Sequence, residues 1–190
     1  MPVIAIDGPV GSGKSTVARA VADRLGLAVL ETGAMYRAVA ALALRDGIPP
    51  GPALAACAAE VDVDAFDPAE LRTPAVNRAV SAVAAEPAVR AALVPRQRAW
   101  IEARGGGVAE GRDMGTVVFP DADLKIFLTA TAGERARRRG DEDPAGVARR
   151  DHLDATRAAS PLVAAEDAVV IDTTGLSVEE IVVRIVGLLP

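Results

Sequence analysis

Residues 8–15 read Gly8-Pro-Val-Gly-Ser-Gly13-Lys14-Ser15, which matches the phosphate-binding pattern G-x-x-x-x-G-K-[S/T]. The apolar, β-branched run Pro2–Ile6 precedes this loop, and residues Ser15–Leu25 have helical periodicity. Such a loop can turn its backbone N–H groups onto phosphate oxygens, because glycine tolerates the bends and the helix terminus adds partial positive charge. The pattern predicts a strand, a phosphate-binding loop and a helix at the start of the chain.

The residues in and beside this loop are candidates for binding phosphate and metal. Lys14 is expected to bridge the β- and γ-phosphates of a nucleotide, and the Ser15 hydroxyl to bind Mg²⁺, which prefers oxygen ligands and retains several waters. Asp7 and Glu110 each close an apolar run, so either carboxylate can hold the ion through water or make a cap or loop hydrogen bond. The residues expected around the nucleotide phosphates are Gly8, Pro9, Val10, Gly11, Ser12, Gly13, Lys14, Ser15 and Thr16.

Further apolar runs along the chain are typical of buried strands. They are Leu27–Leu30, Val108–Ala109, Leu124–Leu128 and Ala168–Ile171, and helical stretches separate them. The Ala- and Arg-rich stretch from residue 53 to residue 104 suits helices punctuated by prolines, among them Pro74, Pro87 and Pro95. Strands that alternate with helices predict an α/β fold, with a five-stranded parallel sheet flanked by helices.

The composition is that of an ordinary globular domain. The chain has 190 residues, of which 51% are hydrophobic and 25% charged, and this length predicts a single domain. The net charge of −5 disfavours extensive binding to nucleic acid. No uninterrupted apolar run reaches the roughly 18 residues of a membrane span, and the amino terminus does not have the pattern of a signal peptide. We expect a cytoplasmic monomer whose partners are small molecules, not nucleic acid or membrane.

The phosphate-binding loop by itself is compatible with several classes of protein. GTPase switches, transport ATPases and kinases of small molecules all contain it. The chain has no Asn-Lys-x-Asp segment for reading guanine and no second glycine-rich signature of a transport ATPase. These observations favour a kinase of a small anionic acceptor. Which small metabolite serves as the acceptor stays open at this point. A nucleotide-hydrolysing switch module also remains an alternative.

Other segments of the chain resemble one family. They are Glu31-Thr-Gly-Ala-Met-Tyr-Arg37, Gly111-Arg-Asp-Met-Gly-Thr-Val-Val-Phe-Pro120 and Arg157-Ala-Ala-Ser-Pro-Leu162. Together with Ile6-Asp-Gly-Pro9 and Ile171-Asp-Thr-Thr174 they resemble the bacterial cytidylate kinases. The resemblance implies that the γ-phosphoryl group of ATP is transferred to CMP or dCMP. It also implies a P-loop kinase domain over residues 1–190, with a core (1–37, 105–133 and 158–190), a helical acceptor-binding segment (38–104) and a lid (134–157).

The same resemblance implies which residues bind the acceptor nucleotide. It places Thr32, Tyr36 and Arg37 beside the nucleotide, and Arg37, Arg112 and Arg157 around its phosphate. Guanidinium groups suit that dianion because they bind its oxygens bidentately and stay charged.

The resemblance also assigns the reading of the base to Ser81, Arg90 and Asp113. A carboxylate and a hydroxyl can accept hydrogen bonds from cytosine while an arginine donates, whereas uracil would leave buried polar groups unpaired. The alternative for Ser81 and Arg90 is that they are polar residues on a helix surface.

Charged residues in the predicted lid complete the candidate site. Arg150, Asp154 and Arg157 are spaced to share one helical stripe, which suits either nucleotide contacts or a solvated salt-bridge ladder. In the run Glu134–Arg139, Arg135, Arg138 and Arg139 share a helical face, and Arg138 or Arg139 is expected to neutralise charge on the transferring group. The alternative is again a solvated charge run. The predicted catalytic residues are Lys14, Arg138, Arg139 and Arg157.

The chain is also shorter than the family pattern in two places. These are the stretch between Val61 and Thr73, where an accessory insert is usual, and the lid between Arg139 and Arg150.

Overall fold

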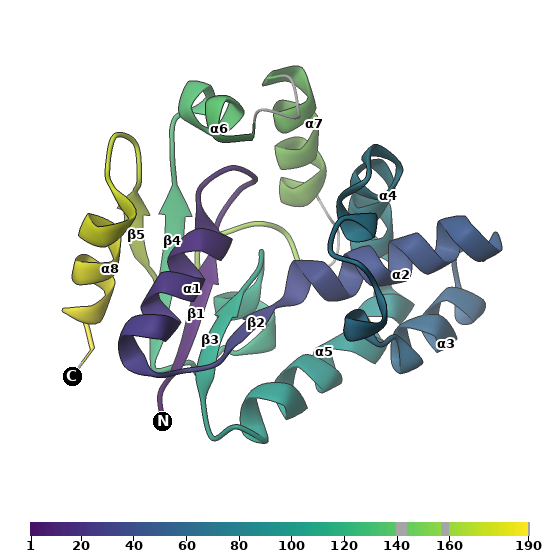
Figure 1. The fold of residues 1–190 in the computed structure, drawn as a ribbon, viewed down its shortest axis with the longest axis horizontal. Coiled ribbons are helices and arrows are strands. Elements are labelled where there is room, and N and C mark those ends of the chain that lie inside the picture. The colour runs from purple at the N-terminus through teal and green to yellow at the C-terminus, as the bar shows by residue number, and fades with distance from the viewer. Residues whose placement is uncertain (140–143, 157–159, 190) are drawn as a thin grey trace. The chain divides into compact units, whose positions relative to one another are not determined.

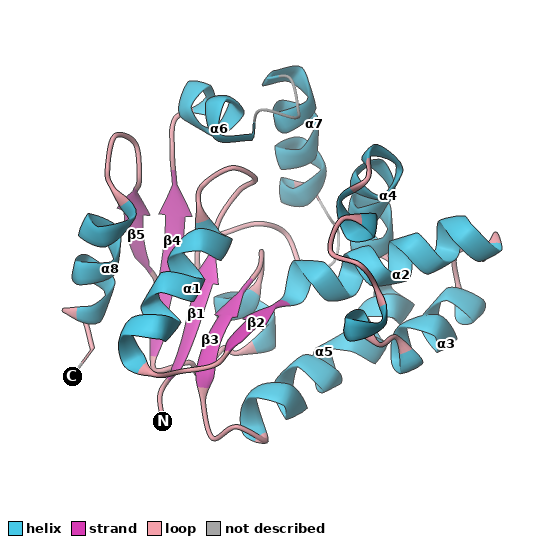
Figure 2. Cartoon of the chain, in the orientation of Figure 1, coloured by secondary structure: helices cyan, strands magenta, loops and turns pink. Residues whose placement is uncertain are grey.

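The computed structural model describes residues 1–139, 144–156 and 160–189, and it confirms the predicted α/β fold. In this part of the chain five strands form one sheet, in the order β2-β3-β1-β4-β5, whose strands run parallel (Figure 2). The strands are β1 (Val3–Asp7), β2 (Val29–Glu31), β3 (Gly107–Glu110), β4 (Leu124–Thr129) and β5 (Val169–Asp172). Each lies within a few residues of its predicted position.

The sheet forms around β1, which pairs with β3 on one side and with β4 on the other. Ile4 is opposite Val108 of β3 and Leu124 of β4, so β1 is the central strand. Central parallel strands are covered on both faces, and this explains their continuous apolar sequences. On one face, α1 (Lys14–Leu25) and α8 (Val178–Val186) pack against each other and against the sheet (Figure 1).

The remaining helices begin and end where the local sequence allows. They are α2 (Thr32–Asp46), α3 (Pro52–Glu60), α4 (Pro74–Ala85), α5 (Pro87–Glu102), α6 (Ala132–Arg139) and α7 (Pro144–Ala155). The first residue of α4 is Pro74, and a backbone N–H at this position would have no acceptor within the helix. The Thr73 hydroxyl accepts a hydrogen bond from the N–H of Val76 at 3.4 Å and so caps the helix.

Pro95 departs from the prediction, because it lies inside α5 instead of ending a helix. A proline in a helix interior removes one backbone hydrogen bond. Leu93 and Gln97 on either side of it are completely buried, so packing of the helix outweighs the lost bond.

The chain divides into two compact units. The first contains residues 1–30 and 100–190, and the second contains residues 31–99. The first unit holds the sheet, the phosphate-binding loop and α6 to α8, whereas in the second α2 packs against α3 and α4. Within the second unit Arg96 of α5 donates hydrogen bonds to the carbonyl oxygens of Ala58 at 2.8 Å and Val61 at 2.7 Å, which ties the end of α3 to α5.

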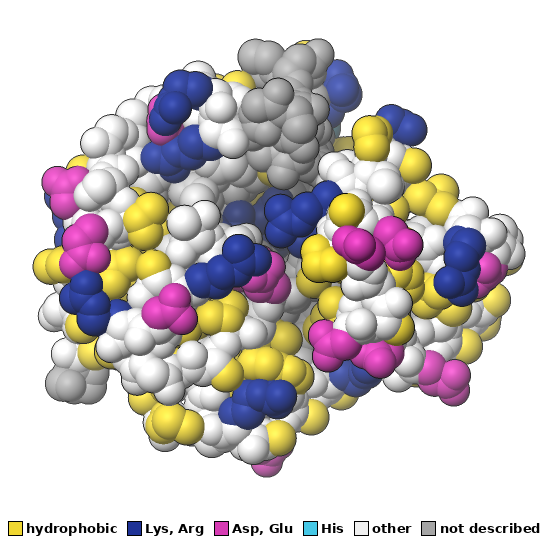
Figure 3. All heavy atoms as spheres, viewed as in Figure 1, with side chains coloured by type: hydrophobic (Ala, Val, Ile, Leu, Met, Phe, Trp, Pro, Cys, Tyr) yellow, Lys and Arg dark blue, Asp and Glu magenta, His cyan; other side chains and the backbone are white. Residues whose placement is uncertain are grey.

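Charged side chains of both signs lie on the face of the molecule that Figure 3 draws. On the face drawn in Figure 3, Lys and Arg side chains are interspersed with Asp and Glu side chains. Among the described residues no helix is both long enough and apolar enough to cross a membrane.

Candidate active site

The phosphate-binding loop connects β1 to α1 as the sequence predicts. At Gly8 the backbone has φ +149°, and a Cβ atom there would lie 2.2 Å from the carbonyl oxygen of Leu128. No residue with a side chain fits so close to β4, so glycine is required for the loop to leave the sheet at this point. The loop then reaches the amino end of α1 at Lys14.

The predicted metal ligands Ser15 and Glu110 lie together. The Ser15 hydroxyl donates a hydrogen bond to Oε1 of Glu110 at 3.1 Å. The two come together because Glu110 ends β3, whose register places it opposite Ile6 of the central strand. A hydroxyl and a carboxylate oxygen form the kind of donor set that Mg²⁺ prefers, so these residues fit the ion.

Lys14 is buried and folds across its own loop. Its Nζ atom donates a hydrogen bond to the carbonyl oxygen of Pro9 at 2.8 Å. An ammonium group held in this place lies within the loop whose backbone N–H groups are expected to bind phosphate.

Asp7 makes loop hydrogen bonds, one of the two roles that the sequence left open. The residue is 4% exposed, and its two carboxylate oxygens accept from the backbone N–H groups of Met114 and Gly115, each at 2.8 Å. Burial raises the pKa of the Asp7 carboxyl to about 6, although these two hydrogen bonds partly oppose the shift. A contribution of Asp7 to metal binding stays a prediction.

Arg112 and Asp113 follow β3 after one intervening residue, Gly111, in the first unit. The Nη1 atom of Arg112 donates to the carbonyl oxygen of Gly8 at 3.1 Å. Asp113 is 3% exposed, and its carbonyl oxygen accepts from the N–H groups of Val117 at 2.9 Å and Val118 at 3.1 Å. These two bonds open a short π-helical turn over Met114–Val118. Such turns are rare and frequently occur at functional sites.

The other predicted acceptor residues lie in the second unit. Thr32 and Tyr36 are buried on α2. The guanidinium group of Arg37 lies beside Gly33, which precedes it by one turn of the same helix. Arg90 of α5 is 6% exposed. Its guanidinium carbon lies 5.7 Å from the centre of the Tyr36 ring. Its Nη1 atom donates a hydrogen bond to the carbonyl oxygen of Ala84 at 3.3 Å. The helix-surface alternative is therefore wrong for Arg90.

Ser81, the remaining base-reading candidate, is half-buried on α4. Its role in reading the base stays a prediction.

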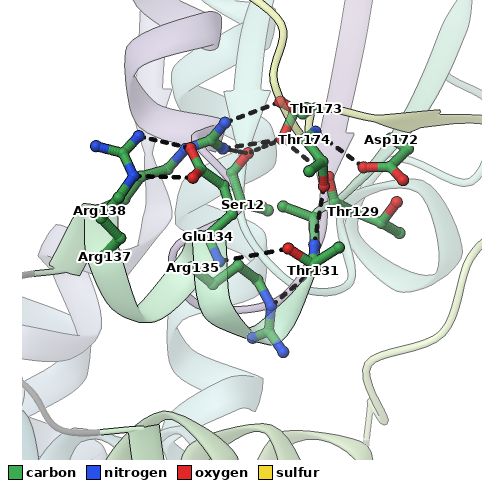
Figure 4. A network of polar contacts seen from close by, with 11 residues as sticks. Ser12, Thr129, Thr131, Glu134, Arg135, Arg137, Arg138, Asp172, Thr173 and Thr174 are labelled. Carbon is green, nitrogen blue, oxygen red and sulfur yellow. Dashed lines mark hydrogen bonds and ion pairs between the residues drawn. The ribbon is translucent and has the colours of Figure 1, made fainter.

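Arg138 is part of a polar network that joins α6 to the ends of β4 and β5 and to the phosphate-binding loop (Figure 4). Its guanidinium group donates to Oγ1 of Thr173 at 2.9 Å, to the carbonyl oxygen of Thr173 at 2.8 Å and to Oε1 of Glu134 at 2.8 Å. The Thr173 hydroxyl in turn lies 3.1 Å from the carbonyl oxygen of Ser12 and can donate to it. Arg138 is thus attached to the loop through the buried Thr173 and also directly, because its Nη1 atom donates to the carbonyl oxygen of Ser12 at 3.4 Å.

The rest of the charge run divides between structural contacts and solvent. Arg135 donates to the carbonyl oxygen of Val10 at 3.1 Å and forms an ion pair with Asp151 of α7. Arg137 fits the solvated alternative, because its side chain is 73% exposed and contacts Glu134. Hydrogen bonds from Arg137, together with one from Arg138, lower the pKa of Glu134 to about 2, so this carboxylate stays ionised.

Part of the predicted lid lies outside the described residues. Arg157 itself does, as do the side chains of Arg139, Arg150 and Asp154. The backbone of α7 is helical through residues 150 and 154, in agreement with the predicted helical spacing.

Sequence reasoning missed the part played by Thr173. The only signal was its place in the segment Ile171-Asp-Thr-Thr174, which the family resemblance includes without assigning it a contact.

Comparison with known proteins identifies one family. The family model described as cytidylate kinase matches residues 4–190. A cytidylate kinase of Mycobacterium leprae is 46% identical over 98% of this chain and 94% of its own length. One from Pelotomaculum thermopropionicum is 48% identical over 98% of this chain and 95% of its own length. The alignment with the Mycobacterium protein has 210 positions, more than the 190 residues of this chain, so that relative contains residues that this chain lacks.

Some relatives are considerably longer. A bifunctional pantoate ligase/cytidylate kinase of Synechococcus sp. (strain CC9605) is 46% identical over 98% of this chain, which spans 45% of that protein. The chain therefore corresponds to less than half of such relatives.

Solved structures share the fold. TT1252 from Thermus thermophilus has a TM-score of 0.53 and 22% identity, over 98% of this chain and 95% of that one. A gluconokinase from Sinorhizobium meliloti has a TM-score of 0.51 and 16% identity, over 98% of this chain and 90% of that one. At such identities the likeness concerns the fold alone.

Proposed function

The chain belongs to the cytidylate kinase family, and from this premise we propose that it transfers the γ-phosphoryl group of ATP to CMP or dCMP, giving ADP and CDP or dCDP. The observation that carries the proposal is the arrangement at the ends of β1 and β3. There the phosphate-binding loop, the Ser15–Glu110 pair and the segment with Arg112 and Asp113 are joined by hydrogen bonds within one unit.

The donor side of the reaction needs binding and neutralisation of the ATP phosphates. Backbone N–H groups of residues 8–13 and the amino end of α1 would bind phosphate oxygens, and Lys14 would leave the Pro9 carbonyl for the β- and γ-phosphates. Ser15, and Glu110 through water, would hold Mg²⁺. The ion, when bound, neutralises charge that develops on the phosphates during transfer. Arg138, Arg139 and Arg157 are the proposed lid arginines at the transferring group.

The acceptor side needs a nucleotide whose phosphate oxygen faces the donor. Arg37, Arg112 and Arg157 would bind the acceptor phosphate, Thr32 and Tyr36 would lie beside the nucleotide, and Arg150 and Asp154 would contact it from the lid. Ser81, Arg90 and Asp113 would read cytosine. No strong base is required, because the attacking phosphate oxygen is already ionised and catalysis consists mainly of positioning and charge stabilisation.

Base selection by Asp113 has a clear physical reason. The carboxylate is buried, so a uracil carbonyl placed against it would leave two acceptors facing each other without water. A cytosine amino group would donate to it instead. We therefore expect a large preference for CMP and dCMP over UMP.

An assay of ADP release tests the proposal. Turnover is measured with CMP, dCMP, UMP, AMP and gluconate as acceptors, for the unmodified protein and for Lys14→Ala, Asp113→Asn and Asp121→Asn. We expect activity with the cytidylates only, loss of transfer in Lys14→Ala, and a lowered CMP/UMP ratio of kcat/KM in Asp113→Asn. Asp121 is exposed in the same part of the chain, so its variant serves as a matched control.

Two results would contradict the proposal. ADP release that does not depend on an acceptor would indicate a hydrolytic switch, and preferential turnover of gluconate would indicate another metabolite kinase. The use of Mg²⁺, the monomeric state and the cytoplasmic location belong to the same proposal; the metal requirement is measured by titrating Mg²⁺ in this assay.

A further inference from the structure

The segment that carries Arg112 and Asp113 is attached to β1 on both sides of these two residues. Before them, the N–H of Gly111 donates to the carbonyl oxygen of Ile6 at 3.0 Å. After them, the N–H groups of Met114 and Gly115 donate to the Asp7 carboxylate. Two residues bracketed in this way have little freedom to change their backbone conformation.

The attachment after Arg112 and Asp113 depends on a single side chain. Both Asp7 oxygens take part, one for each of two consecutive N–H groups, which is a two-point contact of fixed orientation. The carboxylate is buried, so water cannot readily replace it as the acceptor. On the other side of Asp113, the Arg112 guanidinium contacts the Gly8 carbonyl, the residue next to Asp7.

Resting on the proposed function, we infer that Asp7 is a positioning residue for the acceptor side of the reaction. By binding the N–H groups of Met114 and Gly115, it fixes the backbone that presents Arg112 to the acceptor phosphate and Asp113 to the base. It acts through that segment and not by touching either nucleotide. Asp7 therefore determines base selection, although it is a residue of the strand that leads into the ATP-binding loop.

This role differs in its consequences from the metal-binding role also predicted for Asp7. A metal ligand would mainly change the Mg²⁺ and ATP requirements, whereas a positioning residue changes the KM for CMP and the preference for CMP over UMP. Asp7→Asn separates the two. The amide keeps the shape of the carboxylate but replaces one acceptor oxygen with a donor NH₂ group, which would face one of the two backbone N–H groups.

Asp123→Asn is the matched control. Oδ2 of Asp123 accepts a hydrogen bond from the N–H of Val3, at the opposite end of β1, at 2.7 Å. The same substitution there also weakens a contact between a carboxylate and a backbone N–H, but far along the strand from Asp113. Both variants can lose stability, and only Asp7→Asn should change nucleotide selection.

We expect Asp7→Asn to lower the CMP/UMP ratio of kcat/KM by about tenfold or more, the scale of one lost hydrogen bond to a charged group. The KM for ATP and the Mg²⁺ concentration for half-maximal rate should stay within about twofold of the unmodified values. The reason is that the hydrogen bonds from Met114 and Gly115 to Asp7 do not involve the residues proposed to bind ATP and Mg²⁺. Asp123→Asn should keep the unmodified ratio. An unchanged ratio in Asp7→Asn, or a change confined to Mg²⁺ and ATP, would overturn the inference.

A second measurement does not require the variant to fold. In the unmodified protein, amide hydrogen exchange at Met114 and Gly115 should be strongly slowed, as for buried bonded amides. Rapid exchange at both would overturn the inference. Failure of the unmodified protein to phosphorylate CMP would instead contradict the proposed function, so the two failures are distinguishable.

Discussion

Replacing Gly11 by alanine should damage the contact between the phosphate-binding loop and α6. The backbone of Gly11 has φ +76°, and a Cβ atom there would lie 2.7 Å from the carbonyl oxygen, 2.9 Å from Cβ and 3.0 Å from Cα of Arg135. Two of these atoms belong to the helix backbone, so they cannot move aside as a flexible side chain could. Gly11→Ala must therefore shift α6, the loop or both.

Gly26→Ala isolates the steric part of this effect. Gly26 also has a left-handed backbone, with φ +65°, but nothing lies within 4 Å of an added Cβ. Both variants lose about 1–2 kcal/mol because alanine disfavours this conformation. Only Gly11→Ala adds the overpacking cost, which is about 1–3 kcal/mol in a well-packed site. We expect Gly11→Ala to be less stable than Gly26→Ala by that second amount.

The displacement should also weaken ATP binding. Arg135 donates to the carbonyl oxygen of Val10, next to Gly11, so a shift of α6 pulls on the loop itself. Urea unfolding of the two variants measures the stability difference, and the KM for ATP at saturating CMP measures the functional effect. Equal unfolding free energies for the two variants would refute the steric reasoning. A normal KM for ATP in a destabilised Gly11→Ala would refute the link between α6 and the loop.

One further substitution and one pH dependence extend these tests. Arg138→Ala should raise the KM for ATP about tenfold, because it removes the hydrogen bonds to Thr173. Arg137 is exposed, so Arg137→Ala should change the KM for ATP less than about twofold. Equal effects of the two substitutions would contradict a role of the Arg138 network in ATP binding. The Asp7 pKa of about 6 lies above its unfolded value of 3.8. Its contribution to stability is therefore fully present below pH 3.8 and is lost as pH rises through 6. Relative to Asp7→Asn, the unmodified protein should lose about 2 kcal/mol between pH 4 and 7, and a flat difference in urea unfolding would contradict this.

The elements of the fold could be predicted because their signals are local. A parallel sheet covered on both faces gives short, continuous apolar runs, and the five runs correspond to the five strands of the described chain. The glycine pattern at residues 8–15 fixed the first strand, loop and helix together. Pro95 was misjudged because tertiary packing around it cannot be seen in the neighbouring residues.

The polar contacts of the site could be predicted only in part. Sequence spacing indicates which residue types lie on one helical face, but it does not indicate which distant residue completes a hydrogen bond. Asp7 and Met114 are 107 residues apart, and Arg138 and Ser12 are 126 apart. The burial of Arg90 likewise could not be predicted from its neighbours in the sequence. Arginine is mostly exposed in proteins, and nothing in its own helix indicated that this one is buried against Tyr36.

These long-range contacts hold the phosphate-binding loop from two directions. Residues 6–8 accept hydrogen bonds from the segment that carries Arg112 and Asp113, through the Ile6 carbonyl, the Asp7 carboxylate and the Gly8 carbonyl. Residues 10 and 12 are instead held by α6 and the end of β5. One end of the loop is thus joined to the proposed acceptor-reading segment and the other to the start of the lid. Because the two sets of contacts share no residue, a substitution in one set can alter base selection while a substitution in the other alters ATP binding.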